Sequence, residues 1–393
     1  MRVVLSYSGG LDTSAILLLL KEQGHSVITV TVDVGQEDEL MDVEEKAYAM
    51  GAEKHYTVSA AEEFAEKIIS KAIKANALYE KRYPLGTALA RPLIAEKVAS
   101  VALDEGADAV AHGCTGKGND QVRFDNVLLG SLGDDVEIIA PVRDLRLTRE
   151  QSMGILSKHG FDPGVHGKYS IDENLWTRSI EGGEIDDPKQ PPSEDAFQWT
   201  VAPEEAPDEP LLLEIGFEEG LPVSLNGSYL GLAEMIRRLN KLVGAHGYGR
   251  IDHIENRVVG LKSREVYEAP AALTLITAHE DLEKTVLTPR ELRFKQIVDS
   301  WWTDLVYNGL WLEPLRQTLD SAIDSLNKYT SGSVKLKVYK GGLSVLGRWS
   351  DYSSYSPKVI DYDKGWYPTG EEASGYIKIY GLHSIAAVKA REQ

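Results

Sequence analysis

The first 160 residues alternate between short apolar, β-branched runs and longer amphipathic stretches, and this alternation limits the possible folds more than any other feature of the chain. The runs typical of strands lie at 2–7, 26–34, 54–58, 107–113 and 135–142. Helices are predicted between and after them, at 12–23, 39–50, 60–82, 90–106 and 148–160. In the helix at 90–106, Pro92 is expected in the first turn, where proline is tolerated. Strands that alternate with helices predict an α/β fold with a doubly wound parallel sheet.

The sequence pattern changes after residues 186–210, which hold six prolines and eight acidic residues. No regular element is expected at that density of proline, so the segment is interpreted as a surface connection inside a second domain. Beyond it, hairpins are predicted at 211–230, with a turn at Asn226-Gly227, and at 333–349. Helices are predicted at 231–244, 270–283, 289–308 and 313–329, which makes this part α+β.

Three segments are therefore expected: a nucleotide-binding domain at 1–165, an α+β domain at 166–365 and a C-terminal tail at 366–393. The tail ends in a predicted helix at 381–393 with an apolar stripe. Such a stripe is expected to dock on a neighbouring subunit or on its own chain, and the sequence leaves both open.

Charge and cysteine content exclude several classes of protein. The net charge is −19, from 61 acidic and 42 basic residues, and such a surface repels nucleic-acid backbones. Cys114 is the single cysteine, which excludes an intrachain disulfide framework and a cysteine-rich zinc site. The longest apolar run, at 15–20, is too short to span a bilayer, and the start lacks the features of a signal peptide. A cytoplasmic enzyme or binding protein, without membrane or nucleic-acid contacts, is expected.

The stretch SYSGGLDTS, residues 6–14, follows the first predicted strand and opens the first predicted helix. Gly9 and Gly10 allow a tight turn and close approach to a ligand, and the N–H groups at a helix start can hold an anion. Asp12 would be unfavourable beside phosphate unless it holds Mg²⁺ or an amide. The stretch is neither a Walker A loop nor a G-x-G-x-x-G motif. The alternative is a simple N-capping turn, which the full S-G-G-x-D-x-S pattern makes less plausible.

The stretch HGCTGKGNDQVRFD, residues 112–125, follows the fourth predicted strand and carries a second set of glycines and polar residues. If a helix begins near Asn119, then Asp120 and Arg123 lie one turn apart on one face. The alternative is a solvated loop with a surface ion pair of little energetic value. Two such loops at the ends of two parallel strands are hard to explain by packing alone, and they favour a ligand site.

These motifs carry a resemblance to known families. The S-G-G-x-D-x-S pattern resembles the PP-loop of the N-type ATP pyrophosphatases, whose nucleotide-binding domain is of the HUP type. Together with YSIDENLW (169–176) and GRIDHIENRVVGLKSREVYEAPA (249–271), the two loops resemble the argininosuccinate synthases. The resemblance runs from residue 3 to beyond residue 370.

The resemblance implies an AMP-forming C–N ligase of arginine biosynthesis. ATP and L-citrulline would give citrullyl-AMP and pyrophosphate, and the amine of L-aspartate would then displace AMP. It implies ATP as co-substrate, Mg²⁺, no protein-held metal cluster, an α+β synthetase domain after the nucleotide-binding domain, and a homotetramer joined by the C-terminal tail.

Residue by residue, the resemblance implies an ATP site, an aspartate site and a citrulline site. The ATP site would comprise Ser6, Tyr7, Ser8, Gly9, Gly10, Leu11, Asp12, Thr13, Ser14, Gly113 and Val32, the last through its backbone. The aspartate site would comprise Thr115, Asn119 and Asp120. The citrulline site would comprise Tyr83, Asn119, Arg123, Ser170, Ser179, Glu255 and Tyr267. Asp12 and Asp120 are the candidate catalytic residues.

Charge complementarity supports part of this carry-over: Arg123 suits the citrulline carboxylate, with bidentate pairing as one geometry, and Glu255 suits its ammonium. Without the resemblance, Tyr83, Ser170, Ser179, Glu255 and Tyr267 would be read as core aromatics, loop hydroxyls and a surface acid. One departure is Ala88, where family members often carry a serine that contacts the citrulline carboxylate. Thr87 or a water is expected to replace that hydroxyl.

Other functions remain to be weighed. RNA-modifying PP-loop enzymes need a basic face, and the thiolases also need catalytic cysteines. Asparagine and GMP synthetases need a glutaminase domain, and a nucleotide sensor would not need the ENR and YSIDEN motifs. Release of AMP that depends on citrulline and aspartate would distinguish these options. The sequence leaves open whether Asp120 or a substrate phosphate deprotonates the aspartate amine.

Overall fold

A computed structural model describes residues 1–36, 40–163, 167–357 and 369–392. It contains two compact units, Met1–Tyr352 and Ser353–Gln393, which we describe separately. The domain boundaries expected after residues 165 and 365 lie outside the described residues and stay predictions.

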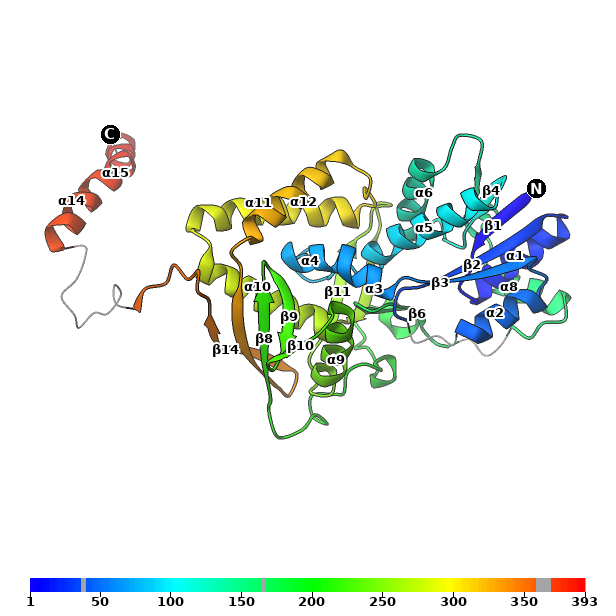
Figure 1. Ribbon diagram of the computed structural model, residues 1–393, viewed down its shortest axis with the longest axis horizontal. Coiled ribbons are helices and arrows are strands. Elements are labelled where there is room, and N and C mark those ends of the chain that lie inside the picture. Colours follow the sequence, from blue (N-terminus) through cyan, green and yellow to red (C-terminus); the bar gives the residue numbers. More distant parts are fainter. Residues whose placement is uncertain (37–39, 164–166, 358–368, 393) are drawn as a thin grey trace. The chain divides into compact units, whose positions relative to one another are not determined.

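A five-stranded parallel sheet forms the N-terminal part of the first unit, in the order β3-β2-β1-β4-β5 (Figure 1). Its strands are β1 (Arg2–Ser6), β2 (Ser26–Asp33), β3 (Lys54–Ser59), β4 (Ala109–Ala111) and β5 (Glu137–Ile139). Val3 pairs with Val27 of β2 on one side and with Ala109 of β4 on the other. The strand order therefore reverses between β1 and β4, which confirms the predicted doubly wound sheet and marks the edge where such sheets bind ligands.

Successive side chains of a strand point to opposite faces of the sheet. Apolar residues of this sheet therefore lie on both faces, and helices cover both. Val3 and Leu5 pack into one apolar cluster with α1, whereas Val4 packs into another with α5. The helices of the first face are α1 (Leu11–Glu22), α2 (Leu40–Ala49), α7 (Pro141–Asp144) and α8 (Arg149–Lys158). The second face is covered by α5 (Gly86–Asp104) and α6 (Asp120–Ser131).

The helix predicted at 60–82 was too long. The helical run consists of α3 (Ala61–Glu63), a π-helical turn η1 (Phe64–Ile69) and α4 (Ser70–Lys74). Asn76, with φ of 43°, and then Glu80 and Lys81, with φ of 49° and 62°, adopt left-handed conformations that a helix cannot continue. This irregular loop carries Tyr79 and Tyr83 to the site described below.

The prediction that Pro92 stands in a first helical turn was also wrong. Helix α5 begins at Gly86, which leaves Pro92 inside the helix. Gly86 is required at this start, because a Cβ there would lie 1.6 Å from the hydroxyl of Thr177. The buried packing of α5 offsets the hydrogen bond that Pro92 cannot donate.

The rest of the first unit is α+β, as predicted. One antiparallel sheet has the order β10-β9-β8-β13-β14, with β8 (Leu211–Glu218), β9 (Leu221–Leu225), β10 (Ser228–Tyr229), β13 (Gly332–Tyr339) and β14 (Gly342–Trp349). A second has the order β11-β12-β7-β6, with β6 (Ser170–Glu173), β7 (Arg178–Glu181), β11 (Arg250–Asn256) and β12 (Lys262–Glu268). The helices are α9 (Leu232–Gly244), α10 (Pro270–Val286), α11 (Pro289–Tyr307) and α12 (Pro314–Asn327).

The proline-rich connection at 186–210 follows a short 3-10 turn, η2 (Gly183–Asp186), and contains a second, η3 (Glu194–Ala196). Its backbone is tied down by the buried carboxylate of Glu268, which accepts hydrogen bonds from the N–H groups of Gln198, Trp199 and Thr200. Arg178 holds the same carboxylate in an ion pair of 2.9 Å.

The second unit contains α14 (Gly370–Tyr380) and α15 (Leu382–Arg391), so the tail forms two helices where one was predicted. A capping box of Thr369 and Glu372 begins α14. Across the described parts of the chain, no helix has the length and apolar character needed to cross a membrane.

Candidate active site

The stretch 6–14 connects β1 to α1, as predicted. Gly9 has φ of 72°, and a Cβ there would come within 3.1 Å of Val43, so both conformation and packing require glycine. Gly10 precedes α1 without a side-chain cap. The first N–H groups of an α-helix have no partner inside the helix, so those of Leu11, Asp12 and Thr13 are available to an anion at this edge.

The side chains of this loop divide into ligand-facing and supporting groups. Ser8 is exposed, and its hydroxyl lies 3.2 Å from that of Thr13. Ser14 and Tyr7 are buried, with their hydroxyl oxygens 3.3 Å apart, and Ser14 also bonds the Gly9 carbonyl. The hydroxyl of Ser14, a residue that the resemblance implies for the ATP site, is thus directed inward, where it fixes the shape of the loop, while Ser6 ends β1 and is half-buried.

The second loop lies against the first at the point where the strand order reverses. A Cβ on Gly113 would lie 3.1 Å from Thr13 and 3.9 Å from Asp12. His112 orients this loop: its Nδ1 accepts the N–H of Cys114, so its Nε2 donates to Asp125 at 2.7 Å. Val32, near the end of β2, is buried, and its carbonyl accepts a hydrogen bond from Gln36.

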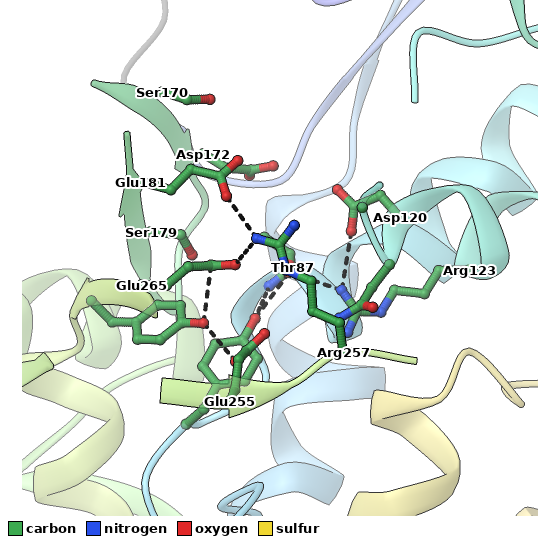
Figure 2. Close-up of a pocket in the computed structure, with 14 residues that line it drawn as sticks. Thr87, Asp120, Arg123, Ser170, Asp172, Ser179, Glu181, Glu255, Arg257 and Glu265 are labelled. Carbon is green, nitrogen blue, oxygen red and sulfur yellow. Dashed lines mark hydrogen bonds and ion pairs between the residues drawn. The ribbon is translucent and has the colours of Figure 1, made fainter. Parts of the chain in front are cut away.

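A polar pocket lies on one face of the sheet β11-β12-β7-β6 (Figure 2). Strand alternation explains its lining, because directly paired residues share a face. Tyr267 pairs with Ser179, Ser179 with Asp172, and Glu181 with Ser170. Residues from α5, α6 and the loop before α5 complete the lining, which consists of Tyr83, Thr87, Gly118, Asn119, Asp120, Arg123, Ser170, Asp172, Ser179, Glu181, Glu255, Arg257, Glu265 and Tyr267.

Asp120 and Arg123 form an ion pair on α6 between a half-buried carboxylate and a buried guanidinium. Arg123 Nη1 donates to Asp120 Oδ1 at 3.0 Å, and Arg91 Nε donates to Asp120 Oδ2 at 2.8 Å. Arg91 also pairs with Asp172. Burial raises the pKa of Asp120, but the two guanidinium groups outweigh it and hold that pKa below its usual value. Asp120 is therefore a carboxylate clamped between two cations.

Most N–H donors of Arg123 are already engaged within the protein, which disfavours bidentate binding of a substrate carboxylate. Its Nε and Nη2 donate to the carbonyl of Tyr307, and its Nη1 donates to Thr87 Oγ1 and Asp120. A guanidinium has five N–H donors, so these contacts leave one N–H on Nη2 for a ligand. Bidentate pairing with a substrate carboxylate would require Asp120 or Thr87 to release Arg123.

Thr87 can supply the hydroxyl that Ala88 lacks. Its Oγ1 accepts from Arg123 at 3.1 Å and lies 2.9 Å from the hydroxyl of Tyr83, which itself accepts the N–H of Thr87. Either hydroxyl can donate in this contact, and when Tyr83 donates, the hydroxyl hydrogen of Thr87 is left for a ligand in the pocket. Ala88 is fully buried and lies outside the lining.

Glu255 anchors a cluster of aromatic hydroxyls. Tyr267 donates to its Oε2 at 2.9 Å and Tyr307 to its Oε1 at 2.8 Å. Tyr267 stacks on Tyr83 with ring centroids 4.4 Å apart. Burial and the nearby carboxylates of Glu265 and Glu255 raise the pKa of Tyr267, so the phenol stays protonated. Asn119 joins the cluster to α6 by donating to the hydroxyl of Tyr307 and accepting the N–H of Val258.

The structure thus brings together most residues that the resemblance implied for citrulline and aspartate. Eight of them line one pocket: Tyr83, Asn119, Asp120, Arg123, Ser170, Ser179, Glu255 and Tyr267. Thr115 is exposed on the preceding loop and is not part of the lining. The residues implied for ATP form their own cluster around Gly9 and Gly113.

Comparison with known proteins gives matches over nearly the whole chain. Residues 2–162 match the family described as arginosuccinate synthase N-terminal HUP domain, and residues 169–387 match the arginosuccinate synthase C-terminal domain. Argininosuccinate synthases of Hyperthermus butylicus and Pyrobaculum aerophilum are 71% and 57% identical, each match covering 100% of this chain and 99% of the relative. That of Metallosphaera sedula is 56% identical, with 100% of both chains covered.

The chain belongs to the argininosuccinate synthase family. It is accordingly an enzyme, and residues 2–162, which contain the parallel sheet, form its HUP domain.

Sequence reasoning missed several residues in the pocket of this argininosuccinate synthase family member. Asp172, Glu181, Arg257 and Glu265 line it, and Arg91 supports it from outside, whereas Thr87, also in the lining, was expected as one replacement for the serine hydroxyl. Strand alternation around Ser179 and Tyr267 would have found the three carboxylates, because they follow the period of two. Arg257 belongs to the ENR motif but was given no role; it lies beyond the end of β11 and reaches back to Glu181 and Glu265, each at 2.7 Å.

Lys46 is a further residue that sequence reasoning missed. It lies on α2, and its Nζ donates to the carbonyl of Gly9 at 2.5 Å. Burial lowers the pKa of Lys46. Its cation lies directly beside the glycine turn that opens the candidate nucleotide site.

The donors near this loop fit a magnesium ion that is held mainly by a nucleotide. Among the described residues, no group of three or more His, Cys, Asp or Glu side chains could hold a metal. Asp12 offers a single carboxylate at the start of α1, oriented by Ser152 Oγ at 2.9 Å. Magnesium bound with nucleotides uses one or two carboxylates and otherwise phosphates and water, which agrees with this donor set.

Proposed function

We propose that the chain condenses L-citrulline and L-aspartate to argininosuccinate, with ATP converted to AMP and pyrophosphate through citrullyl-AMP. The main support is one juxtaposition. The uncapped start of α1 meets the loop after β4 at the reversal of the strand order, and α6, which follows that loop, carries Asp120 and Arg123 into the polar pocket. Nucleotide phosphates and an amino acid could then meet across the loop 112–119.

In the first step, the ureido oxygen of citrulline attacks the α-phosphorus of ATP and pyrophosphate leaves. The oxygen is a weak neutral nucleophile, so catalysis rests on positioning and on stabilisation of charge. The N–H groups at Leu11–Thr13 and the ammonium of Lys46 would bind the phosphates, and Asp12 would hold Mg²⁺ with them. When bound, Mg²⁺ would supply neutralisation of the charge that develops on pyrophosphate.

Citrulline would be held by the groups of the pocket. Thr87 and the free N–H of Arg123 would bind its carboxylate, and Glu255 would bind its ammonium. Asn119, with both side-chain groups engaged, would keep α6 aligned with α11.

In the second step, the amine of aspartate displaces AMP from the activated carbon. Asp120 is a poor proton acceptor because Arg91 and Arg123 keep its pKa low. We therefore propose that Asp120 orients the arginines and the aspartate ammonium, and that a phosphate oxygen of the substrate accepts the proton. Thr115 and Asn119 would complete the aspartate site.

The test uses citrulline labelled with ¹⁸O at the ureido oxygen. The proposal requires that AMP carries the label, since the C–O bond breaks when aspartate displaces AMP. AMP release should depend on citrulline, and argininosuccinate should form when aspartate is added. Formation of ADP, or of unlabelled AMP, would contradict the proposal.

A further inference from the structure

The hydroxyl of Tyr267 lies between two carboxylates. It is 2.9 Å from Glu255 Oε2 and 3.0 Å from Glu265 Oε2. A phenol has one hydrogen and can donate to only one of them. Glu255 also accepts from Tyr307, whose own hydroxyl accepts from Asn119, so the Tyr307 hydrogen is directed to Glu255. The second contact of Tyr267 therefore needs a hydrogen from a carboxyl group.

We infer that the carboxyl of Glu265, which shares the Tyr267 hydroxyl with Glu255, holds one exchangeable proton in the free pocket, and that the α-ammonium of citrulline displaces it on binding. This inference rests on the proposed function, because it takes the ligand of Glu255 to be the citrulline ammonium. It assigns to Glu265 a binding role that the sequence motifs did not indicate.

The electrostatics of the pocket support a stored proton. Burial, together with the carboxylates of Glu255 and Glu181, raises the pKa of Glu265 to about 7 in spite of the ion pair with Arg257. The lining holds five acidic side chains but only the cations Arg123 and Arg257. Arg257 is shared between Glu265 and Glu181, at 2.7 Å each, so it does not neutralise both.

Charged and titratable groups from the neighbouring elements contribute to the electrostatic potential at Glu265. His253 pairs directly opposite Glu265 across β11 and β12, with its Nε2 3.1 Å from Glu80. Glu181 faces the pair from β7, Asp172 from β6, and Asp120 with Arg123 from α6. Arg91, on α5, pairs with Asp120 and Asp172. The remaining titratable neighbours are Tyr79, Tyr83, Tyr267 and Tyr307, and burial raises the pKa of each, so they remain neutral.

Binding of citrulline then replaces the proton by the α-ammonium group. The carboxyl hydrogen of Glu265 leaves as a proton to the buffer, no covalent bond of citrulline changes, and the ammonium takes its place between Glu255 and Glu265. A carboxyl with a pKa near 7 is half protonated at pH 7, so binding should release about half a proton per citrulline. The dissociation constant should fall about tenfold between pH 6 and pH 8 if the ammonium lowers that pKa by about two units.

The test is calorimetric titration of citrulline into the full chain saturated with α,β-methylene-ATP, whose α–β bridge cannot be cleaved. Titrations at pH 7 in PIPES and in imidazole, which differ in ionisation enthalpy, give the number of protons released. Glu265→Gln should bind citrulline with no proton release and lose the pH dependence. Asp299→Asn is the matched control, because burial also raises the pKa of that carboxyl to about 7 and it lies outside the pocket lining.

The outcomes are distinct. Citrulline binding without proton release, or release that persists in Glu265→Gln, would overturn the inference and leave the proposed function intact. Loss of release in Asp299→Asn would also overturn it. Absence of any citrulline binding to the wild-type chain would overturn the proposed function and this inference together.

Discussion

The ammonium of Lys46 donates a hydrogen bond of 2.5 Å to the carbonyl oxygen of Gly9, in the turn that opens the candidate nucleotide site. The two residues belong to different elements, α2 and the loop between β1 and α1. The contact places a partly buried cation beside N–H groups that have no intrahelical partner, where a polyphosphate would carry several negative charges.

Replacing Lys46 by methionine should therefore raise the KM for ATP by about 10- to 100-fold, the range of a lost charge-assisted hydrogen bond, with a smaller effect on the KM for citrulline. AMP formation measured over a range of ATP concentrations tests this. Lys21→Met on the exposed side of α1 is the control. An unchanged KM for ATP would show that Lys46 only supports the conformation of the loop at Gly9 and does not bind ATP.

Asp12→Asn should impair the use of ATP and Mg²⁺ while the fold survives. The amide oxygen of asparagine can still accept the hydrogen bond that Ser152 donates at 2.9 Å, so only the charge is removed. We expect the Mg²⁺ concentration at half-maximal rate to rise by about tenfold or more, the value of about 1.4 kcal/mol of binding free energy. Normal turnover at low Mg²⁺ would remove Asp12 from the site.

Arg123→Ala should chiefly raise the KM for citrulline, by about 10- to 100-fold, because it deletes a charged donor to the carboxylate. Since Arg123 is buried and holds Tyr307, thermal unfolding of the variant must be measured alongside. Arg123→Lys retains the charge without the planar fork and should recover part of the loss. Citrulline saturation equal to that of the wild type would refute the carboxylate assignment.

Thr87→Val should raise the KM for citrulline by about tenfold, since it removes a hydroxyl that can donate into the pocket. The variant keeps the size of the side chain, so loss of packing is a minor effect. Ala88→Ser should have little effect in the wild-type background, because Ala88 lies outside the lining. Equal KM values for citrulline in Thr87→Val and the wild type would show that Thr87 does not bind the citrulline carboxylate.

The buried cluster of Asp299, Glu283 and Lys295 predicts a pH dependence of stability. Burial, only partly offset by Lys295, raises the pKa of Asp299 to about 7, so the native state binds a proton that the unfolded chain releases at lower pH. The stability that this proton contributes is present below pH 4 and is lost as pH rises through about 7.

The unfolding temperature of Asp299→Asn should therefore depend less on pH between pH 5 and pH 8 than that of the wild type. Over that interval the variant should gain about 2–3 kcal/mol of unfolding free energy relative to the wild type. Thermal unfolding at both pH values measures this. Glu291→Gln, in the exposed capping box of α11, is the comparison variant. Parallel pH profiles for the wild type and Asp299→Asn would contradict the prediction.

Local signals sufficed to predict the alternating elements. Periodicity gave the five parallel strands, and the glycines of 6–14 gave the loop after β1, since glycine conformation and β-branched runs act over a few residues. The helix boundaries near 60–92 were wrong, because they depend on contacts with distant residues. Gly86 starts α5 because Thr177 leaves no room for a side chain, and the packing of α5 overrides the local preference of Pro92.

The sequence by itself determined the strand–helix alternation, the two glycine loops and the family, because motifs and periods are local properties of the chain. Only the tertiary structure decided which charges meet. Lys46 reaches Gly9, Arg91 reaches Asp120, and Glu255 of β11 reaches the Tyr267 hydroxyl beside Glu265 of β12, each through a contact between separate elements. The physical reason is that pKa values and donor counts depend on burial and on neighbours in space, and the linear sequence specifies neither until the chain has folded.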